Sequence, residues 1–250
     1  MRNNYYQYQY EYDSHHFTIE CCFPKSSTKG CLVFYYGGGW INDTRASLFD
    51  FADDMADDGI AVFLPQYRVY GEHGVYPNVG LYDTVEGLKK IPEICYNFGI
   101  DSSNIVWAGG SAGAHLVLCS ALLKPYYPGY SPKKMFFFNP VCCPDSLSEW
   151  VENECGATFT FEGMCPLHDI QHAGPQILIM QGTDDEIAPF SDSLEFAEKY
   201  TVLGGICEII PYPGRKHAFF HKSKSVEDYI STLTISKKYI LNEDYYRLEV

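Results

Sequence analysis

Basic residues are scarce in this 250-residue chain: 18 Lys and Arg stand against 32 Asp and Glu, which gives a formal net charge of −14. Proteins that bind nucleic acid gain most of their affinity from clusters of Lys and Arg, because these side chains neutralise phosphates. We therefore expect no nucleic-acid partner. The same negative charge disfavours contact with anionic membrane surfaces.

Long apolar runs are also absent. No stretch reaches the roughly 20 apolar residues that a helix needs to cross a bilayer. The opening segment, MRNNYYQYQYEYDSHH, has neither the apolar middle nor the small-residue cleavage site of a secretory signal. These features predict a cytoplasmic protein with no membrane contact. Hydrophobic residues still make up 46% of the chain, which is ample for a packed core.

Cysteine is too sparse for a disulfide-stapled fold, at ten residues in a chain of this length, and several cysteines fall within apolar runs. We expect most of them to be reduced and buried. One segment nevertheless gathers several possible zinc ligands: Cys142, Cys143, Cys155, Cys165, His168 and His172. Their spacing is irregular and contains no repeated C-x-x-C pair, so we predict ordinary loop cysteines there and no bound metal, with a zinc site as the alternative.

Apolar runs of strand length alternate with segments of helical periodicity. The expected strands cover 31–36, 60–67, 104–110, 134–140, 176–182 and 207–213, and the expected helices cover 46–58, 80–98, 112–123, 191–203 and 223–241. This order predicts an α/β fold with a mostly parallel central sheet flanked by helices. The length suits a single domain over residues 1–250.

Two segments depart from this alternation. Residues 6–12 read YQYQYEY, a period-two pattern that predicts an antiparallel strand near the sheet edge with one covered face; the alternative is an aromatic platform for sugar. Residues 141–175 contain Pro and Gly and show no clean period. We expect this stretch to form a short cap over the carboxyl edge of the sheet, where ligands bind in open α/β folds.

The segment WAGGSAG places Ser111 between Gly109 and Gly113, after an expected strand and before an expected helix. This is the G-x-S-x-G pattern of a nucleophile elbow. Such a tight turn strains the serine backbone and leaves room only for very small neighbours, so that strand and helix can close on it. The pattern predicts that Ser111 is a catalytic nucleophile.

A serine hydroxyl needs a base, and the base needs an acid that orients it. The acidic run Asp184, Asp185 and Glu186 follows one expected strand, and His217 follows the next. The chain order serine, acid, histidine is the order found in α/β-hydrolases. The run YYGGGW at 35–40 adds three glycines whose backbone N–H groups suit an oxyanion hole. It lacks the G-K-[ST] ending of a phosphate loop and the G-x-G-x-x-G of a dinucleotide site.

Taken together, these motifs resemble the hormone-sensitive-lipase-like esterases of the α/β-hydrolase fold, a group that includes bacterial acetyl and feruloyl esterases of carbohydrate breakdown. The resemblance covers about residues 31 to 220 and rests on YGGGW, on YR at 67–68 with Pro77 and Asp83, and on GGSAGAH, QGTDDEIAP and GRKHAFF. It implies a structural role for Arg68 and Asp83. It also shows a departure, since the family usually has His where this chain has Tyr36.

The same resemblance implies the roles of individual residues. The catalytic residues would be Ser111, Asp185 and His217, and the oxyanion donors would be the N–H groups of Gly38, Gly39 and Ala112. His115, four residues after the serine, is expected to pack rather than react. No cofactor is implied, because the triad needs none.

The activity we expect is that of a serine carboxylesterase acting on short acyl esters, above all acetyl esters of small molecules or of oligosaccharides from plant polysaccharide. Trp40, next to the predicted donors, is expected to bind substrate as a wall of the acyl pocket. The alternatives are a serine peptidase or an arylformamidase on the same scaffold, and a binding protein of this fold without turnover. The sequence is also compatible with an oligomer.

Overall fold

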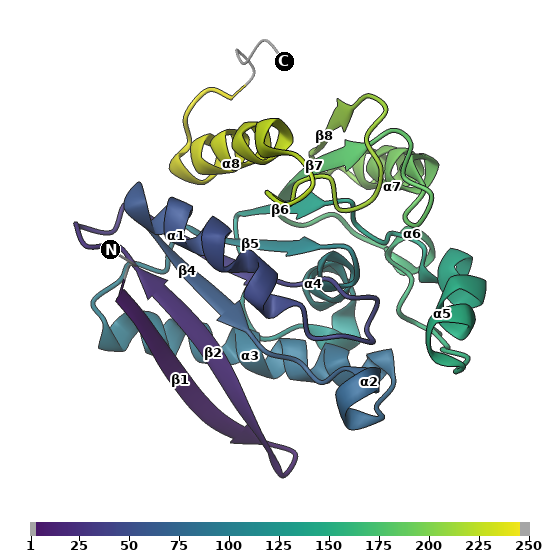
Figure 1. The fold of residues 1–250 in the computed structure, drawn as a ribbon, viewed down its shortest axis with the longest axis horizontal. Helices are drawn as coiled ribbons and strands as arrows, with labels where there is room; N and C mark the ends of the chain where they lie inside the picture. The colour runs from purple at the N-terminus through teal and green to yellow at the C-terminus, as the bar shows by residue number, and fades with distance from the viewer. Residues whose placement is uncertain (1–3, 246–250) are drawn as a thin grey trace.

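An eight-stranded sheet runs through the middle of the protein in the computed structural model, which describes residues 4–245 (Figure 1). The strand order is β1-β2-β4-β3-β5-β6-β7-β8, in which β1–β2 and β2–β4 are antiparallel and every other pair is parallel. The expected mostly parallel sheet is therefore confirmed. The strands are β1 (Asn4–Tyr12), β2 (His15–Phe23), β3 (Gly30–Tyr35), β4 (Ile60–Pro65), β5 (Ile105–Gly110), β6 (Lys134–Phe138), β7 (Gln176–Gly182) and β8 (Cys207–Tyr212).

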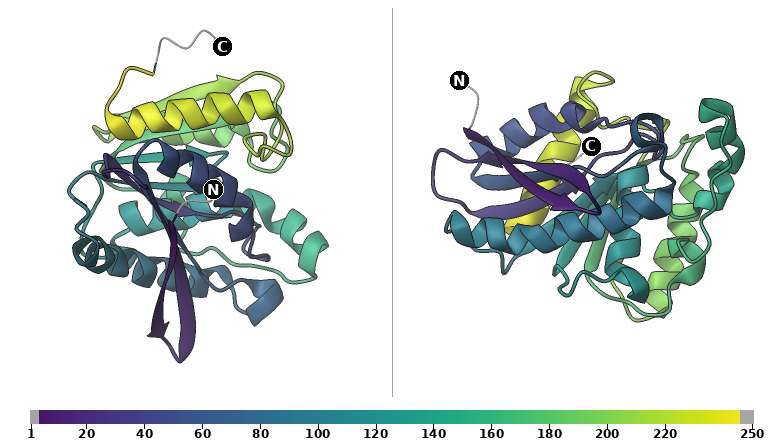
Figure 2. Two further views of the ribbon diagram at one scale, coloured as in Figure 1. Left: turned by 60° about the vertical axis from the view of Figure 1, so that its left-hand side comes forward. Right: turned by 90° about the horizontal axis from the view of Figure 1, so that it is seen from below.

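Helices cover both faces of this sheet (Figures 1 and 2). On one face α1 contacts β2 and β4, α8 contacts β3, and the two helices touch each other; α3, α4 and α7 pack on the opposite face. The helices are α1 (Phe49–Asp57), α2 (Tyr70–His73), α3 (Pro77–Asn97), α4 (Ala112–Leu122), α5 (Ser148–Cys155), α6 (Pro166–Asp169), α7 (Phe190–Val202) and α8 (Val226–Leu241), with short 3₁₀ turns η1 (Arg45–Leu48), η2 (Lys124–Tyr126) and η3 (Pro144–Leu147).

The sequence predicts only one of the two strands of the N-terminal hairpin. The aromatic segment forms the edge strand β1 as expected, with Tyr10 buried and Tyr6 exposed. Its partner β2 was not expected, because the turn between them lacks the glycine that usually marks a tight hairpin. Asp13 and Ser14 make this turn instead, with φ of 50° and 57°, a left-handed conformation that Asp tolerates better than most residues.

The buried ion pair between Arg68 and Asp83 is linked to this hairpin through an exposed contact with Asp13. The guanidinium of Arg68 donates to both carboxylate oxygens of Asp83, from Nε at 2.9 Å and from Nη2 at 2.8 Å, and to Asp13 at the hairpin turn. Asp83 also accepts the backbone N–H of Arg68. A buried charge destabilises a protein unless it is fully paired, and the charges of Arg68 and Asp83 are paired here. The pair holds the chain where it leaves β4.

The central strands carry the site. Every residue of β4 and β5 is buried, since helices cover both of their faces. Parallel strands end at the same edge of a sheet, so the loops that follow β3, β5, β7 and β8 meet there. These are the loops that hold the glycine run, Ser111, Asp185 and His217.

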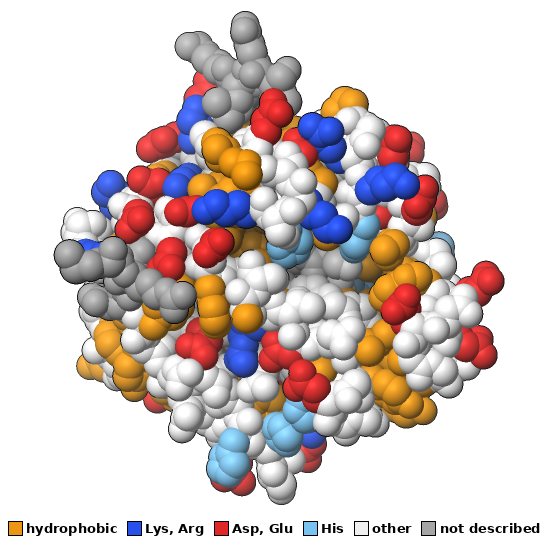
Figure 3. Space-filling model, viewed as in Figure 1, with side chains coloured by type: hydrophobic (Ala, Val, Ile, Leu, Met, Phe, Trp, Pro, Cys, Tyr) orange, Lys and Arg blue, Asp and Glu red, His pale blue; other side chains and the backbone are white. Residues whose placement is uncertain are grey.

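Residues 141–175 leave the sheet after β6 and return at β7, and they contain η3, α5 and α6. We call this segment the cap. α5 stands at the carboxyl edge of the sheet rather than against either face (Figure 1). Within residues 4–245 no helix combines the length and the apolar character that crossing a bilayer requires. On the face seen in Figure 3, Lys and Arg side chains are interspersed with Asp and Glu.

Candidate active site

Ser111 occupies a strained turn between β5 and α4. Its φ of 52° and ψ of −122° lie outside the regions that a residue with a side chain normally adopts. The backbone N–H of Ser111 donates to Phe138 O at 3.0 Å, which ties the turn to the neighbouring strand. This geometry is that of the predicted nucleophile elbow.

The glycines beside Ser111 are required by close backbone packing. A Cβ on Gly113 would overlap the carbonyl oxygens of Tyr35 and Tyr36, and one on Gly109 would lie 2.6 Å from Ala114 N. Neither neighbour is a flexible side chain that could move aside. The strand and the helix can therefore close on Ser111 only because these two positions have no side chain.

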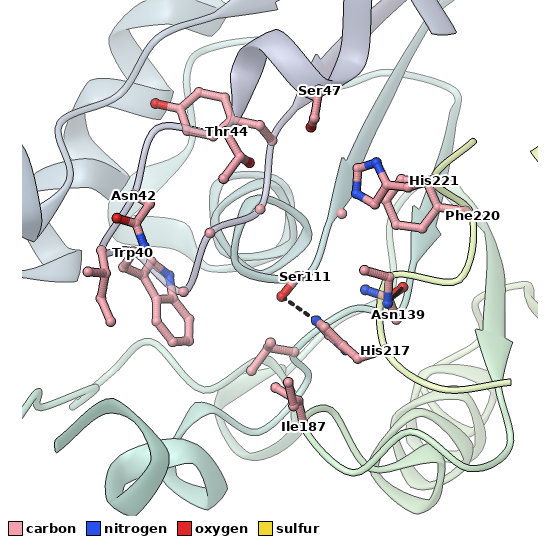
Figure 4. A pocket seen from close by; sticks show the side chains of 18 of the residues that line it. Trp40, Asn42, Thr44, Ser47, Ser111, Asn139, Ile187, His217, Phe220 and His221 are labelled. Atoms are coloured by element: carbon pink, nitrogen blue, oxygen red, sulfur yellow. Dashed lines mark hydrogen bonds between the residues drawn. The ribbon is translucent and has the colours of Figure 1, made fainter. Parts of the chain in front are cut away.

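Ser111, His217 and Asp185 form one hydrogen-bonded chain. Ser111 Oγ lies 2.9 Å from His217 Nε2, and His217 Nδ1 lies 2.8 Å from Asp185 Oδ2 and 3.0 Å from Oδ1 (Figure 4). Asp184 is exposed and bonds to Thr183 instead. The structure thus brings together the three side chains that the sequence singled out, and it selects Asp185 from the acidic run.

Asp185 is held in place from its own loop. Its Oδ1 accepts the backbone N–H groups of Ile187 at 3.0 Å and Ala188 at 2.9 Å, and its side chain is fully buried. These two bonds fix the orientation of the carboxylate towards His217. Asp185 can therefore hold a proton on Nδ1 of His217, so that Nε2 faces Ser111 as an acceptor.

A second histidine, His221, lies near His217 and adds no charge to the site near pH 7. Burial lowers the pKa of His221, and the neighbouring His217 and Lys224 lower it further. The imidazole of His221 is therefore neutral near pH 7. Its ring packs against Phe220, with the centroids 4.3 Å apart.

The glycine run reaches the same point from β3. Gly38 and Gly39 have positive φ, at 106° and 63°, and both line the cavity that contains Ser111. Gly38 O accepts the N–H groups of Ile41 and Asn42, which closes the loop into a turn. Ala112 is the first residue of α4, where the N–H groups of a helix have no partner within the helix and the helix dipole favours negative charge.

Tyr36 buttresses this loop where the resemblance would place a histidine. Its hydroxyl donates to Tyr67 O at 2.9 Å, and the hydroxyl of Tyr67 donates back to Tyr36 O at 3.0 Å and Gly37 O at 3.1 Å. The two rings stack with centroids 4.4 Å apart. This reciprocal pair is buried, so it fixes the carbonyls that precede the glycine run.

The cavity around Ser111 and His217 has a volume of about 430 Å³. Figure 3 shows this face of the protein hollowed near its centre. Trp40 and Ile187 lie on one side of Ser111, while Ser47 and His221 lie on the other (Figure 4). The lining is completed by residues of the glycine loop, of η1, of the loop after β8, and by cap residues Val141, Leu147, Trp150 and Glu154.

A second cavity of about 250 Å³ adjoins the first and shares part of its wall. Its lining is more polar than that of the first, and it includes Ser47, Asp50, His221, Lys222 and Ser223. The sequence did not predict this cavity. It forms between η1, the start of α1 and the loop that carries His217.

Trp40 lies between the glycine loop and the cap, as a wall of the main cavity. It is 2% exposed, and its ring lies 4.8 Å from Phe161 and 5.2 Å from His115, edge-on to the latter. The ring of Trp150 stands close over Gly39, where a Cβ would lie 2.7 Å from it. The cap is therefore part of the cavity wall rather than a separate lobe.

His115 packs as expected. It is fully buried, and its Nε2 donates to Met164 O in the cap at 2.6 Å. Burial lowers the pKa of His115 to about 4, so the ring is neutral near pH 7. Within the described part of the chain its imidazole makes no hydrogen bond to Ser111 or His217; only its backbone N–H donates to Ser111 O, at 3.1 Å.

Asn139 is a site residue that sequence reasoning missed. It follows β6, has a φ of 37°, and is fully buried. Its Oδ1 accepts the backbone N–H of Ala218 at 3.2 Å, which anchors the loop that carries His217. The sequence could have identified Asn139, because it is a polar residue directly after an apolar strand, at the same carboxyl edge as Ser111.

The cap cysteines and histidines fall into two groups. Cys143, Cys165 and His168 have ligand atoms that all lie within 4.8 Å of one another. The thiol of Cys142 faces Ser193, and that of Cys155 donates to Val151 O within its own helix. His172 is exposed.

Comparison with known proteins agrees with the fold. The BD-FAE family profile matches residues 21–127. Over 81% of the chain, the sequence is 25% identical to a probable isoprenylcysteine alpha-carbonyl methylesterase of Oryza sativa, 56% of which is covered. It is 23% identical to an acetylxylan esterase of Xylanibacter ruminicola, over 80% of this chain and 43% of that protein. The chain spans about half the length of the curated relatives it matches.

Solved structures match over the full length. Esterase 2 of Thermogutta terrifontis, phosphonylated by sarin, superposes with a TM-score of 0.84 at 23% identity and covers 100% of this chain and 98% of its own. The propionate-bound form of the same esterase gives 0.81 at 24% identity, over 98% and 97%. These matches confirm the resemblance to esterases of this fold. The protein is an α/β-hydrolase-fold chain with a BD-FAE-like segment from residue 21 to residue 127.

Proposed function

We propose that this protein is a serine esterase that hydrolyses short acyl esters, with acetyl esters of hydroxylated small molecules as its preferred substrates. One observation carries the proposal. A continuous hydrogen-bonded chain runs from buried Asp185 through His217 to Ser111, and it ends in a cavity large enough for a small ester.

In the proposed reaction, Ser111 Oγ attacks the ester carbonyl carbon while its proton moves to His217 Nε2. The negative charge that develops on the carbonyl oxygen faces the N–H groups of Gly38, Gly39 and Ala112. The C–O bond then breaks, and the alcohol leaves with the proton from His217. Water repeats the sequence on the acyl-enzyme, which releases the carboxylic acid and restores the serine. Asp185 stabilises the imidazolium that forms in each half.

The part of the cavity beside Trp40 and Ile187, which would hold the acyl group, suits short acyl chains. Trp40 and Ile187 stand on one side of Ser111, and the cap brings Trp150 against the glycine loop. These bulky side chains limit the depth available to an acyl group. Esterase 2 of Thermogutta terrifontis has been solved with propionate and with butyrate bound, which are also short acids.

The alcohol side supports a hydroxylated leaving group. The second cavity begins at Ser47 and His221 and presents the side chains of Asp50, Lys222 and Ser223. Carboxylate, ammonium and hydroxyl groups suit the hydrogen-bonding needs of a sugar. An acetylated oligosaccharide from plant polysaccharide fits this surface, and one relative is named an acetylxylan esterase.

A cytoplasmic location is part of the proposal. All ten cysteines are free, including the adjacent pairs in β2 and in the cap. Thiols in such number persist in a reducing compartment, whereas oxidising compartments favour disulfides.

The first test removes the nucleophile. Ser111→Ala is expected to lower the rate of p-nitrophenyl acetate hydrolysis by about 10⁴-fold or more, because the covalent step is lost. A fluorophosphonate probe should label the wild type and Ser103→Ala, whose serine is exposed and distant, but not Ser111→Ala. A wild-type protein that neither turns over ester nor takes up the probe would instead be a binding protein of this fold.

The second test separates substrate classes. We expect acetylated xylo-oligosaccharide to be cleaved faster than a dipeptide amide, N-formylkynurenine or a prenylcysteine methyl ester, and turnover of p-nitrophenyl esters to fall beyond butyrate. Lys222→Ala should raise KM for the oligosaccharide several-fold with little change for p-nitrophenyl acetate, since the small ester does not reach the second cavity. Faster cleavage of the amide, the formamide or the methyl ester would overturn the substrate assignment but leave the serine mechanism standing.

A further inference from the structure

Three side chains in the cap form a cluster that the ester chemistry does not use. Cys143, Cys165 and His168 line neither of the two cavities around Ser111. Their sulfur and nitrogen atoms all lie within 4.8 Å of one another, and Cys143 Sγ is 3.7 Å from His168 Nε2. Two thiols and an imidazole are donors of the kind that bind zinc.

The spacing of these donors fits tetrahedral coordination. Zinc binds thiolate sulfur at about 2.3 Å and imidazole nitrogen at about 2.0–2.1 Å, so the S···N edge of a tetrahedron is about 3.6 Å and the S···S edge about 3.8 Å. The observed 3.7 Å between Cys143 and His168 matches the first of these edges. The other two donor–donor distances are at most 4.8 Å, so each has to shorten by at most about 1 Å for the three donors to face a common centre.

The backbone around the cluster holds it in this arrangement. Cys142 O accepts the N–H of Leu167 at 2.9 Å, which joins the two segments that supply the ligands. Asp169 accepts the N–H of Cys165 at 2.8 Å and closes the turn at the start of α6. Lys199, from α7, donates to the carbonyl of His168 at 2.9 Å. An arrangement fixed in this way loses little entropy when a ligand binds.

We propose that Cys143, Cys165 and His168 bind one Zn²⁺ through two thiolates and one imidazole, with water in the fourth position. Each thiol gives up its proton to solvent as its sulfur takes the metal, so no redox step is involved. The site joins the two ends of the segment 144–164. This segment carries Trp150, whose ring stands over Gly39, so the metal would hold the cap against the donor loop.

Cobalt is the probe that tests the ligand set, because thiolate-to-Co²⁺ charge transfer reports sulfur ligation directly. The reduced wild-type protein should bind one Co²⁺ per chain with this absorption and release it to Zn²⁺. Cys143→Ser, Cys165→Ser and His168→Ala should each weaken binding by at least about tenfold. Cys155→Ser is the matched control, since Cys155 lies in the same segment outside the cluster, and it should bind as the wild type does.

Thermal unfolding gives an independent readout of the same site. Zn²⁺ should raise Tm in the wild type and in Cys155→Ser, because a ligand that binds only the folded state stabilises it, and it should leave Tm unchanged in Cys143→Ser. The metal-free variants must show the circular dichroism of the wild type. Reduced wild-type protein that binds Zn²⁺ no more tightly than Cys143→Ser would overturn the proposal. Both measurements are independent of ester turnover.

Discussion

The loops at the strand ends and the cap contribute to the same cavity in different ways. Ser111, Asp185 and His217 each lie in a turn or loop that follows a strand, and hydrogen bonds donated by backbone N–H groups fix the turn at Ser111 and the loops of Asp185 and His217. The cap contacts the site through side chains and one carbonyl, notably Trp150 over Gly39 and Met164 O on His115. The three proposed catalytic side chains thus come from loops at the strand ends, while the cap contributes to the wall of the cavity.

The sharpest way to test this contrast is to add one methyl group to each region. Gly113→Ala places a Cβ against two backbone carbonyls, so we expect a loss of about 3 kcal/mol or more in the free energy of unfolding, and loss of ester turnover. Gly163→Ala, in the cap, has open space and only a positive φ of 66° to overcome, which costs about 1–2 kcal/mol. Urea unfolding measures both. Equal losses would show that the two regions are equally tight.

The junction between the regions should respond to pH through His115. Its pKa is about 4 in the folded protein and ordinarily about 6.5 in an unfolded chain, so between these values the unfolded state binds more protons. The stabilisation is complete above about pH 6.5 and is lost as the pH falls towards 4, by about 3 kcal/mol in total. His115→Phe should lack this part of the pH dependence. Parallel stability curves for the two proteins from pH 7 to pH 4 would contradict the assignment.

A smaller effect is expected from the tyrosine pair beneath the glycine loop. Tyr67→Phe removes the hydroxyl that bonds to Tyr36 O and Gly37 O, which should cost about 1–2 kcal/mol of stability. It should also lower kcat several-fold with little change in KM, because oxyanion donors act in the transition state. The matched control is Tyr200→Phe, which removes a hydroxyl bonded to Pro175 O behind the sheet. The control should lose comparable stability and keep kcat.

The strands and the turn at Ser111 could be predicted from the sequence because the structure requires particular residue types at those positions. Only glycine fits at 109 and 113, and strands buried on both faces must be continuously apolar. These two constraints locate Ser111 and the loops that meet it. The six strands expected from apolar runs are confirmed within a few residues, and α3 begins at Pro77, earlier than expected, because proline suits the first helical position.

The remaining features depend on contacts that leave no local pattern. β2 was missed since Asp13 and Ser14 turn the chain without glycine, and the single-turn α2 and α6 are too short to show a period. The irregular spacing of the cap cysteines and histidines led us to predict no bound metal, and that prediction stays untested. Cys143 nevertheless meets Cys165 and His168 through the fold, 22 and 25 positions along the chain.

The ion pair between Arg68 and the hairpin turn has a consequence for how this sheet ends. β2 lies along β4, and every residue of β4 is buried. Were the hairpin to detach, β4 would present a bare row of backbone N–H and C=O groups flanked by apolar side chains, a template on which another chain can add a strand. The pairing of β2 with β4, to which the contact from Arg68 to Asp13 adds, therefore keeps this row of backbone groups covered.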